Sequence, residues 1–331
     1  MSRFLAICLG ILVGAAGAKA GECPGNPDAL GTSRTIVVDP TEHPRLGSMQ
    51  YRDSLPLQDH EVVITFDDGP LPPRSTKVLD TLAHECVKVT YFLVGSMAKN
   101  FPSVVRRIRD DGHTIGTHSN THPLTFHKMS VEKASQEIND GIAAVKAALD
   151  DGTGPAPFFR IPGLLRADGV ERYLASQQLQ IWSADFTADD WTKINANQVY
   201  QRALQQLEIN HRGILLLHDI HPRTVDALPN LLQELKRRGY HVVHVVPATA
   251  ALSKTATEPN QWLRNPRKER PQVAATDPSA AAGTDATPHD GAQTQPAKKP
   301  AAKKPAAPKP VAQKPVLPKP NPLAATAASP H

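Results

Sequence analysis

From Glu61 to about residue 246, short apolar runs rich in β-branched residues alternate with segments in which apolar residues recur at helical spacing. This alternation predicts seven strands, at 61–66, 88–94, 113–117, 157–160, 179–184, 213–217 and 241–246. It predicts six helices, at 75–85, 98–110, 130–150, 168–177, 195–211 and 224–238. Strands that alternate with helices in this way are typical of a parallel α/β domain, built either as an open doubly wound sheet or as a barrel.

Several helix boundaries carry their own signals. Ser75, Ser130 and Asp168 stand where N-cap residues belong, because their side chains can accept a hydrogen bond from the first turn. Gly112 and Gly239 follow two of the predicted helices, where the backbone often turns left-handed.

The alternation stops toward the amino terminus. Residues 1–20 combine Arg3, an apolar run from Phe4 to about Ala16 and the sequence Ala18-Lys19-Ala20. This is the pattern of a secretory signal peptide with its cleavage site, so we expect a secreted, periplasmic or cell-envelope protein. This apolar run is shorter than the roughly 20 residues that a membrane span needs, and it is removed with the signal peptide. We therefore expect no transmembrane segment after cleavage. Residues 21–57, with one short apolar patch at 35–38, predict an irregular leader lying on a domain of residues 58–250.

Residues 251–331 predict a disordered tail, because Ala, Pro, Thr, Gln and Lys dominate and no apolar periodicity remains to build a core. Residues 291–331 hold seven lysines and no acidic residue, whereas the whole chain has a net charge of only +5. The basic character therefore belongs to the tail. Its expected partners are anionic cell-envelope polymers or membrane surfaces and not nucleic acid, although a solvated spacer has the same composition.

Cysteine use is compatible with export. Cys8 lies within the predicted signal peptide, so the mature chain keeps Cys23 and Cys86. In an oxidising compartment these two residues form either one disulfide or two free thiols, and the sequence leaves both open.

Polar residues gather where the predicted strands end. In parallel α/β folds, the carboxyl ends of the strands are where ligands bind, so this position indicates a functional site. The residues are Asp67 and Asp68 after the first strand, His118 after the third, Arg160 at the fourth, Asp185 after the fifth and His218 after the sixth.

Asp68, His118 and His122 indicate a metal site. Two histidines four residues apart meet on one face of a helical turn, as in other zinc sites. A carboxylate from a neighbouring strand end completes a set of three ligands, which leaves a position open for water, as in catalytic zinc sites.

Five segments resemble, in order, the five motifs of the polysaccharide deacetylases, the NodB-homology group also called carbohydrate esterase family 4. They are Thr65-Phe66-Asp67-Asp68-Gly69, the His118 to His122 pair, Phe159-Arg160-Ile161-Pro162, Asp190-Trp191 and Leu216-Leu217-His218-Asp219. The resemblance covers about residues 58–250. It implies a distorted (β/α) barrel of about seven parallel strands.

The resemblance also implies roles for the polar residues. Asp68, His118 and His122 would bind one divalent metal ion, most often zinc, and Asp67 would be the general base. A metal lowers the pKa of its water to about 7, and the base takes the proton as water attacks an acetamide carbonyl.

The remaining roles concern the base, the leaving group and the acetyl group. Arg160 would keep Asp67 ionised and oriented, and His218 would be the general acid, oriented by Asp190. Leu216 would line the pocket for the acetyl methyl group, and Trp191 would contact the substrate.

Two positions depart from the family pattern. Gly163 stands where the family usually has Tyr or Phe, so its backbone amide is kept for the oxyanion while the groove becomes more open. The fourth motif offers three carboxylates, Asp185, Asp189 and Asp190; we assign the orienting role to Asp190 because it precedes Trp191.

The expected function is metal-dependent removal of N-acetyl groups from a polysaccharide or oligosaccharide that contains N-acetylglucosamine, either peptidoglycan or a chitin-like glycan. One alternative is a non-catalytic glycan-binding or envelope-anchoring protein on the same scaffold. Another is a deacetylase of O-acetyl esters or of a different acylated amine. Because Asp67, the three candidate ligands, Arg160 and His218 are all present, the sequence favours an enzyme.

Overall fold

In the computed structural model, one sheet contains all the named strands, and every pairing between them is parallel. The structure describes residues 23–264, so the predicted signal peptide and most of the predicted tail lie outside the described residues. The strands are β1 (Thr32–Val38), β2 (Arg45–Leu46), β3 (Glu61–Asp67), β4 (Thr90–Leu93), β5 (Thr114–Thr117), β6 (Phe158–Phe159), β7 (Gln180–Trp182), β8 (Phe186–Thr187), β9 (Gly213–His218) and β10 (His241–Pro247).

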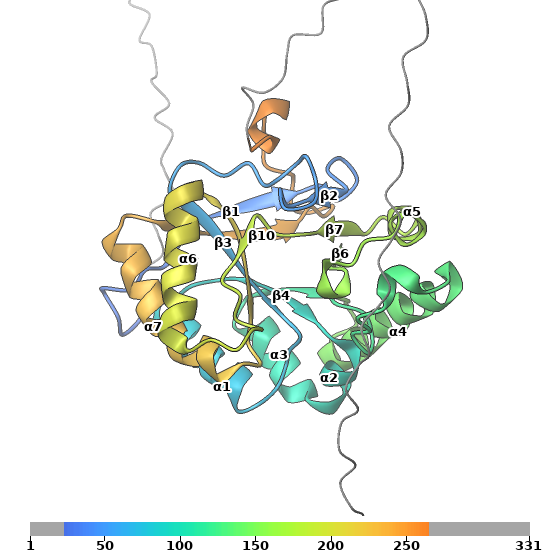
Figure 1. Ribbon diagram of the computed structural model, residues 1–331, viewed down its shortest axis with the longest axis horizontal. Helices are drawn as coiled ribbons and strands as arrows, with labels where there is room; N and C mark the ends of the chain where they lie inside the picture. The colour runs from blue at the N-terminus through green and yellow to red at the C-terminus, as the bar shows by residue number, and fades with distance from the viewer. Residues whose placement is uncertain (1–22, 265–331) are drawn as a thin grey trace, which may run out of the picture. The chain divides into compact units, whose positions relative to one another are not determined.

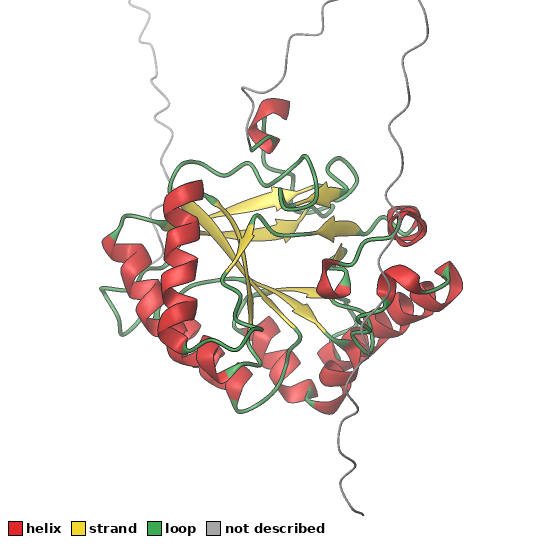
Figure 2. Ribbon diagram, viewed as in Figure 1, coloured by secondary structure: helices red, strands yellow, loops and turns green. Residues whose placement is uncertain are grey.

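Helices lie outside the strands (Figures 1 and 2). The α-helices are α1 (Arg74–His84), α2 (Gly95–Asn100), α3 (Pro102–Asp110), α4 (Val131–Leu149), α5 (Asp168–Ser176), α6 (Ala196–Asn210) and α7 (Pro222–Arg237). Short 3₁₀ helices are η1 (Phe126–Lys128), η2 (Pro162–Leu164) and η3 (Pro259–Trp262). Within residues 23–264, no helix has the length and apolar character needed to cross a membrane.

Helix boundaries agree with the sequence in part. The predicted helix at 98–110 is two helices, α2 and α3, because Pro102 lacks the N–H that would continue α2 and instead begins α3. Ser130 caps α4 by accepting from the backbone N–H of Lys133. The predicted caps Ser75 and Asp168 are wrong: both lie inside their helices, which begin after Pro73 and Ala167.

The strands curve around an apolar interior and form a distorted barrel. Along β9, Ile214 and Leu216 join an inner cluster with Phe92 and Trp182, whereas the alternating Leu215 and Leu217 pack toward the helices. The paired strands run in the order β1-β10-β3-β4-β5-β6-β7-β2, with β9 paired to β3 and β8 paired to β9. The resemblance thus predicts the barrel correctly, and the described sheet has three strands beyond the seven expected: β1, β2 and β8.

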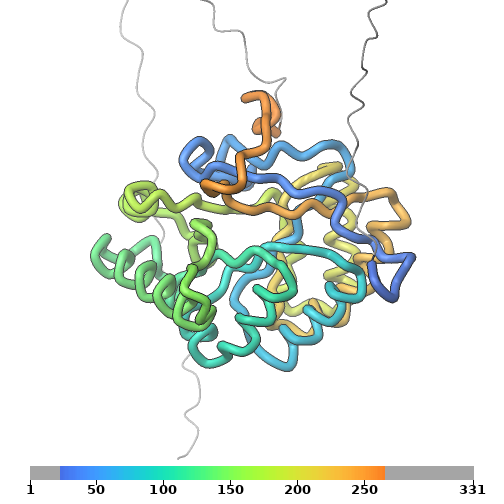
Figure 3. Tube along the Cα trace, turned by 180° about the vertical axis from the view of Figure 1, so that it is seen from behind, coloured from blue at the N-terminus to red at the C-terminus, as the bar shows by residue number. Residues whose placement is uncertain are grey.

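The leader at 21–57 is more regular than predicted. Its apolar patch belongs to β1, which pairs with β10 and buries Ile36 and Val38 completely or nearly so. Figure 3 shows the blue segment of β1 and the orange segment of β10 side by side, as this pairing requires. A single short apolar run gives no alternation with helices, so the sequence alone did not distinguish this strand from a loop.

Cys23 and Cys86 are joined by a disulfide, with their Cα atoms 5.7 Å apart. The bond ties the start of the described chain to the turn that follows α1. Of the two possibilities left open by the sequence, the structure therefore has the disulfide.

The packed region also continues past residue 250, where the sequence predicts the tail to begin. Trp262 is only 5% exposed and belongs to the inner apolar cluster. Its ring stacks on His43, with ring centroids 3.5 Å apart, and its carbonyl accepts a hydrogen bond from the backbone N–H of Ser54. The composition did not predict this contact, because a single tryptophan in a segment without apolar periodicity does not indicate packing against a core.

We predict that a chain ending after Arg264 is more stable than an otherwise identical chain ending after residue 250. The shorter chain loses Trp262, and truncating a buried tryptophan to alanine costs about 3–5 kcal/mol. Urea unfolding of both chains, with Trp262→Ala in the longer chain as the single-residue comparison, measures the difference. Equal unfolding midpoints for all three proteins would show that the folded domain ends at about residue 250.

Candidate active site

Apart from Asp185, the polar residues singled out at the predicted strand ends lie at one edge of the sheet. Asp185 instead lies beside Ile214, near the start of β9. In register, Asp67 at the end of β3 is opposite His218 at the end of β9, and Thr117, next to His118, is opposite Phe159, next to Arg160. Since all these strands are parallel, their carboxyl ends converge. The fold therefore brings together four segments that are far apart in the chain.

Asp68, His118 and His122 form a compact group whose ligand atoms all lie within 4.8 Å of one another. The Oδ1 atom of Asp68 is 3.5 Å from Nε2 of His118 and 3.2 Å from Nε2 of His122. The predicted helical turn is wrong, however. Residues 119–122 form an irregular turn in which Ser119 and His122 have positive φ angles, and the Ser119 hydroxyl accepts from the backbone N–H of His122.

The donor atoms of this group suit a divalent metal ion. His118 donates its Nδ1–H to the carbonyl of Arg160 at 2.6 Å, which leaves the Nε2 lone pair directed at Asp68. Asp68 Oδ1 is buried and accepts no hydrogen bond from any described residue. Burial lowers the pKa of His118 despite the opposing charges of Asp67 and Asp68, and so favours the neutral imidazole that binds metals.

Asp67 is held separately from this group by Arg160. The guanidinium of Arg160 is completely buried, and its Nη1 donates to Asp67 Oδ1 at 2.6 Å and to the Thr65 hydroxyl at 2.8 Å. Its Nη2 donates to the carbonyl of Ser183, and the group lies 4.2 Å from the centre of the Phe92 ring. The other oxygen of Asp67 remains 3.8 Å from Nε2 of His118. One carboxylate oxygen is thus fixed while the other faces the candidate metal site.

His218 approaches the same site from β9. Its Nδ1–H donates to Asp190 Oδ1 at 2.7 Å, and its Nε2 lies 4.0 Å from Asp68 Oδ2. Asp190 is buried and also accepts from the backbone N–H of His218 and the hydroxyl of Thr224. Burial alone would lower the pKa of His218, but the hydrogen bond and charge of Asp190, with smaller effects of Asp67 and Asp68, raise it to about 9.

The two other carboxylates of the fourth motif have different partners. Asp185 accepts from the backbone N–H groups of Ser48 and Ile214 and from the hydroxyl of Ser54, and it pairs with Arg264. It therefore joins neighbouring segments of the barrel. Asp189 is half-exposed and pairs with Arg202. Of the three, Asp190 alone contacts His218 in the described structure.

The residues expected to contact the substrate border the site. The Trp191 ring is 49% exposed and meets the His218 ring edge-on, with centroids 5.7 Å apart. Leu216 is buried below His218 on the inner face of β9. Gly163 has a φ of 59°, and a Cβ built there would lie 3.3 Å from Cδ2 of Leu124, which is itself 64% exposed. An exposed leucine therefore stands beside the glycine that replaces the usual aromatic residue.

Sequence reasoning missed the supporting residues around the site. The Thr65 hydroxyl accepts from Arg160 and donates to the carbonyl of Leu215, and the Thr224 hydroxyl donates to Asp190. Hydroxyl residues in such roles give no distinctive sequence pattern. Asp219 follows His218 directly and is completely buried against Gly69, where burial, partly opposed by Ser75, raises its pKa to about 7. The sequence shows that Asp219 is next to the predicted general acid His218, but it does not show that Asp219 is buried.

Known proteins share this arrangement of elements. The model of the polysaccharide deacetylase family matches residues 55–182. A peptidoglycan-N-acetylglucosamine deacetylase of Bacillus cereus is 31% identical over 196 residues, which cover 58% of this chain and 89% of the relative. Another from Listeria monocytogenes is 33% identical over 187 residues, 56% of this chain but only 38% of the relative.

A solved structure of a Bdellovibrio bacteriovorus peptidoglycan deacetylase superimposes with a TM-score of 0.58 at 28% identity. The match covers 67% of this chain and 63% of that one. The chain thus spans less than two thirds of the Listeria and Bdellovibrio proteins. The B. cereus relative, in contrast, is matched over nearly all of its length. On this match and the family model, the chain belongs to the polysaccharide deacetylase family.

Proposed function

We propose that the protein is a metal-dependent hydrolase that removes N-acetyl groups from a glycan containing N-acetylglucosamine. One observation carries the proposal: a three-ligand group, an unliganded carboxylate and a carboxylate-bound histidine converge at one edge of the sheet. Each is within reach of a single reacting amide. The proposed ligands are Asp68, His118 and His122, and zinc is the proposed metal.

In the proposed reaction, Asp67 is the general base. When bound, a divalent metal polarises the amide carbonyl and lowers the pKa of a water molecule to about 7. The free oxygen of Asp67 accepts a proton from the water molecule, and the oxygen of that water attacks the carbonyl carbon. Arg160 holds the carboxylate in place, because its Nη1 donates to the other oxygen at 2.6 Å.

His218 completes the reaction as the general acid. The C–N bond breaks when the nitrogen gains a proton, and His218 supplies it from Nε2, since its Nδ1–H is engaged by Asp190. The products are acetate and a free amine on the sugar. The raised pKa of His218 supports this role, because the imidazolium is then present near neutral pH.

Peptidoglycan is the substrate that we propose, because the B. cereus and L. monocytogenes relatives are named for it. Two exposed apolar side chains are available to contact a glycan, Leu124 beside Gly163 and Trp191 beside His218. Export through residues 1–20 and retention on anionic envelope polymers through the basic tail also stay proposals. Both concern parts of the chain outside the described residues.

Zinc-loaded protein should release acetate from peptidoglycan, and more slowly from chitooligosaccharides. Acetylated xylan is the control for O-acetyl esterase activity. Removal of the metal with a chelator should abolish release and added zinc should restore it, because water loses its activating cation. Release from xylan alone would identify an O-acetyl esterase, and release from none of the three would favour the non-catalytic glycan-binding protein.

The dependence of turnover on pH should report the pair of His218 and Asp190. His218 must be protonated to act, so turnover falls on the alkaline side as pH rises through its pKa. Asp190 raises that pKa, so Asp190→Asn should move the alkaline limb to lower pH and reduce the maximal rate. The measurement is the initial rate of acetate release across the alkaline range.

Asp189→Asn is the matched control, because Asp189 is the neighbouring carboxylate but pairs with Arg202 instead of His218. Its alkaline limb should stay where it is in the unmodified protein. If Asp189→Asn shifts the alkaline limb and Asp190→Asn does not, then Asp189, and not Asp190, is the carboxylate that orients His218.

A further inference from the structure

A second group of one aspartate and two histidines lies at the opposite edge of the sheet from the candidate active site. Asp59 and His60 directly precede β3, and His211 lies between the end of α6 and the start of β9. Their potential ligand atoms all lie within 4.8 Å of one another, as do those of Asp68, His118 and His122. The same donor set therefore occurs twice, once at each end of the neighbouring strands β3 and β9.

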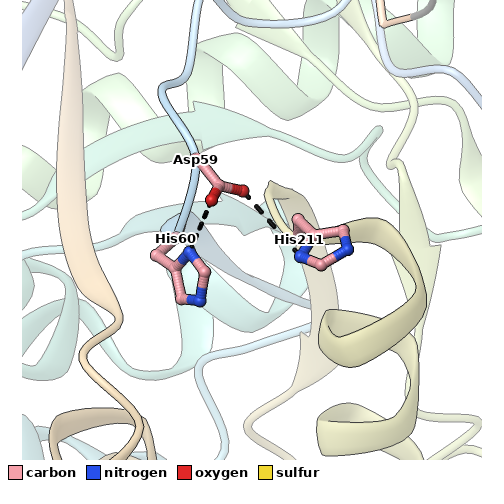
Figure 4. Close-up of side chains that lie close together, drawn as sticks. All are labelled: Asp59, His60 and His211. Carbon is pink, nitrogen blue, oxygen red and sulfur yellow. Dashed lines mark hydrogen bonds and ion pairs between the residues drawn. The ribbon is translucent and has the colours of Figure 1, made fainter.

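The carboxylate of Asp59 lies between the two imidazoles, with one oxygen toward each (Figure 4). Its Oδ2 is 2.8 Å from Nδ1 of His60, and its Oδ1 is 3.9 Å from Nδ1 of His211. Ligand atoms bound tetrahedrally at about 2.0–2.1 Å from a zinc ion stand roughly 3.3 Å apart, so small side-chain rotations bring all three into range. The three residues are half-exposed or exposed, so an ion can enter from solvent.

The backbone already fixes the segments that carry these side chains. The N–H of His60 donates to the carbonyl of His211 at 3.0 Å, and the carbonyl of His60 accepts from His241 at 2.8 Å. The His60 ring also packs at a tilt against Tyr240, with centroids 4.9 Å apart. Little conformational entropy therefore remains to be lost by the backbone when an ion binds.

The end of α6 favours a cation at this group. His211 is the C-cap of α6, so the negative end of the helix dipole points toward the group. The nearby Glu208 and Arg238 pair with each other, and Arg212 directs its guanidinium to the carbonyl of Leu57. The carboxylate of Asp59 makes its described contacts with the two histidines only.

We propose that Asp59, His60 and His211 form a second binding site for a divalent transition metal such as zinc. The ion joins the turns that precede β3 and β9, whose far ends carry Asp67, Asp68 and His218. It acts as a structural clamp on the two strands that hold the active-site carboxylates and the candidate acid. Two imidazoles and one carboxylate are the nitrogen and oxygen donors that zinc accepts.

The test counts zinc bound per chain in a zinc-buffered solution, using protein purified without a histidine tag. The unmodified chain should bind one zinc ion more than the double variant His60→Asn, His211→Asn. Asparagine is chosen because both histidines have φ near +60°, a conformation that asparagine tolerates. The double variant should keep its acetate release, because neither histidine contacts the candidate active site, and zinc should raise its unfolding temperature less.

His84→Asn is the matched control, since His84 is an exposed histidine paired with the single carboxylate of Glu85. It should bind as much zinc as the unmodified chain. Anomalous diffraction from zinc-soaked crystals should place the additional ion between Asp59, His60 and His211. Equal zinc content in the unmodified chain and the double variant would overturn the proposal and leave the group as a network of ion pairs. This outcome is independent of whether the protein acts on a glycan.

Discussion

The buried ion pair between Arg160 and Asp67 is the interaction on which the candidate site depends. A guanidinium with no exposed surface is stable only when its charge is paired and its N–H groups are engaged, and Asp67, Thr65 and the Ser183 carbonyl meet most of that need. Removing one partner of such a pair costs about 3–5 kcal/mol, because the other charge stays buried. The pair therefore joins β3 to β6 and gives two adjacent aspartates different surroundings: Asp67 faces an arginine, and Asp68 faces two imidazoles.

The parallel sheet makes this separation possible. Asp67 is the last residue of β3 and keeps the direction of the strand, whereas Asp68 has a φ of 74° and turns away from it. Consecutive side chains thus reach different partners at one strand end, and His218 arrives in register from β9. The site is assembled from strand ends and irregular turns. Helix and strand propensities do little to determine the backbone conformation of such segments. The proposed second metal site uses the other ends of the same two strands.

The sequence predicted the seven main strands, because each is an apolar run bounded by turn residues. It also predicted the residues that meet at their carboxyl ends, except for Asp185, which is hydrogen-bonded to Ile214 near the start of β9. The prediction failed where a single contact determines the local structure. β1 rests on a single apolar patch, and Trp262 anchors a segment with a disordered composition. The turn from His118 to His122 was expected to be helical, since spacing alone does not distinguish a helical turn from a left-handed one. The proximity of His211 to Asp59 follows from strand pairing across 152 residues and has no local signal.

We infer that Asp67 and Asp68 have different roles although they are neighbours in the chain. Zinc content and acetate release, measured together for Asp67→Asn and Asp68→Asn, test this division of roles. Asp67→Asn should keep the zinc at the candidate active site and lose turnover, because the proton acceptor is gone while the ligands remain. Asp68→Asn should lose that zinc and turnover together, because one of three ligands is weakened. An Asp67→Asn protein that still turns over, or that loses zinc as readily as Asp68→Asn, would show that the two aspartates do not divide these roles.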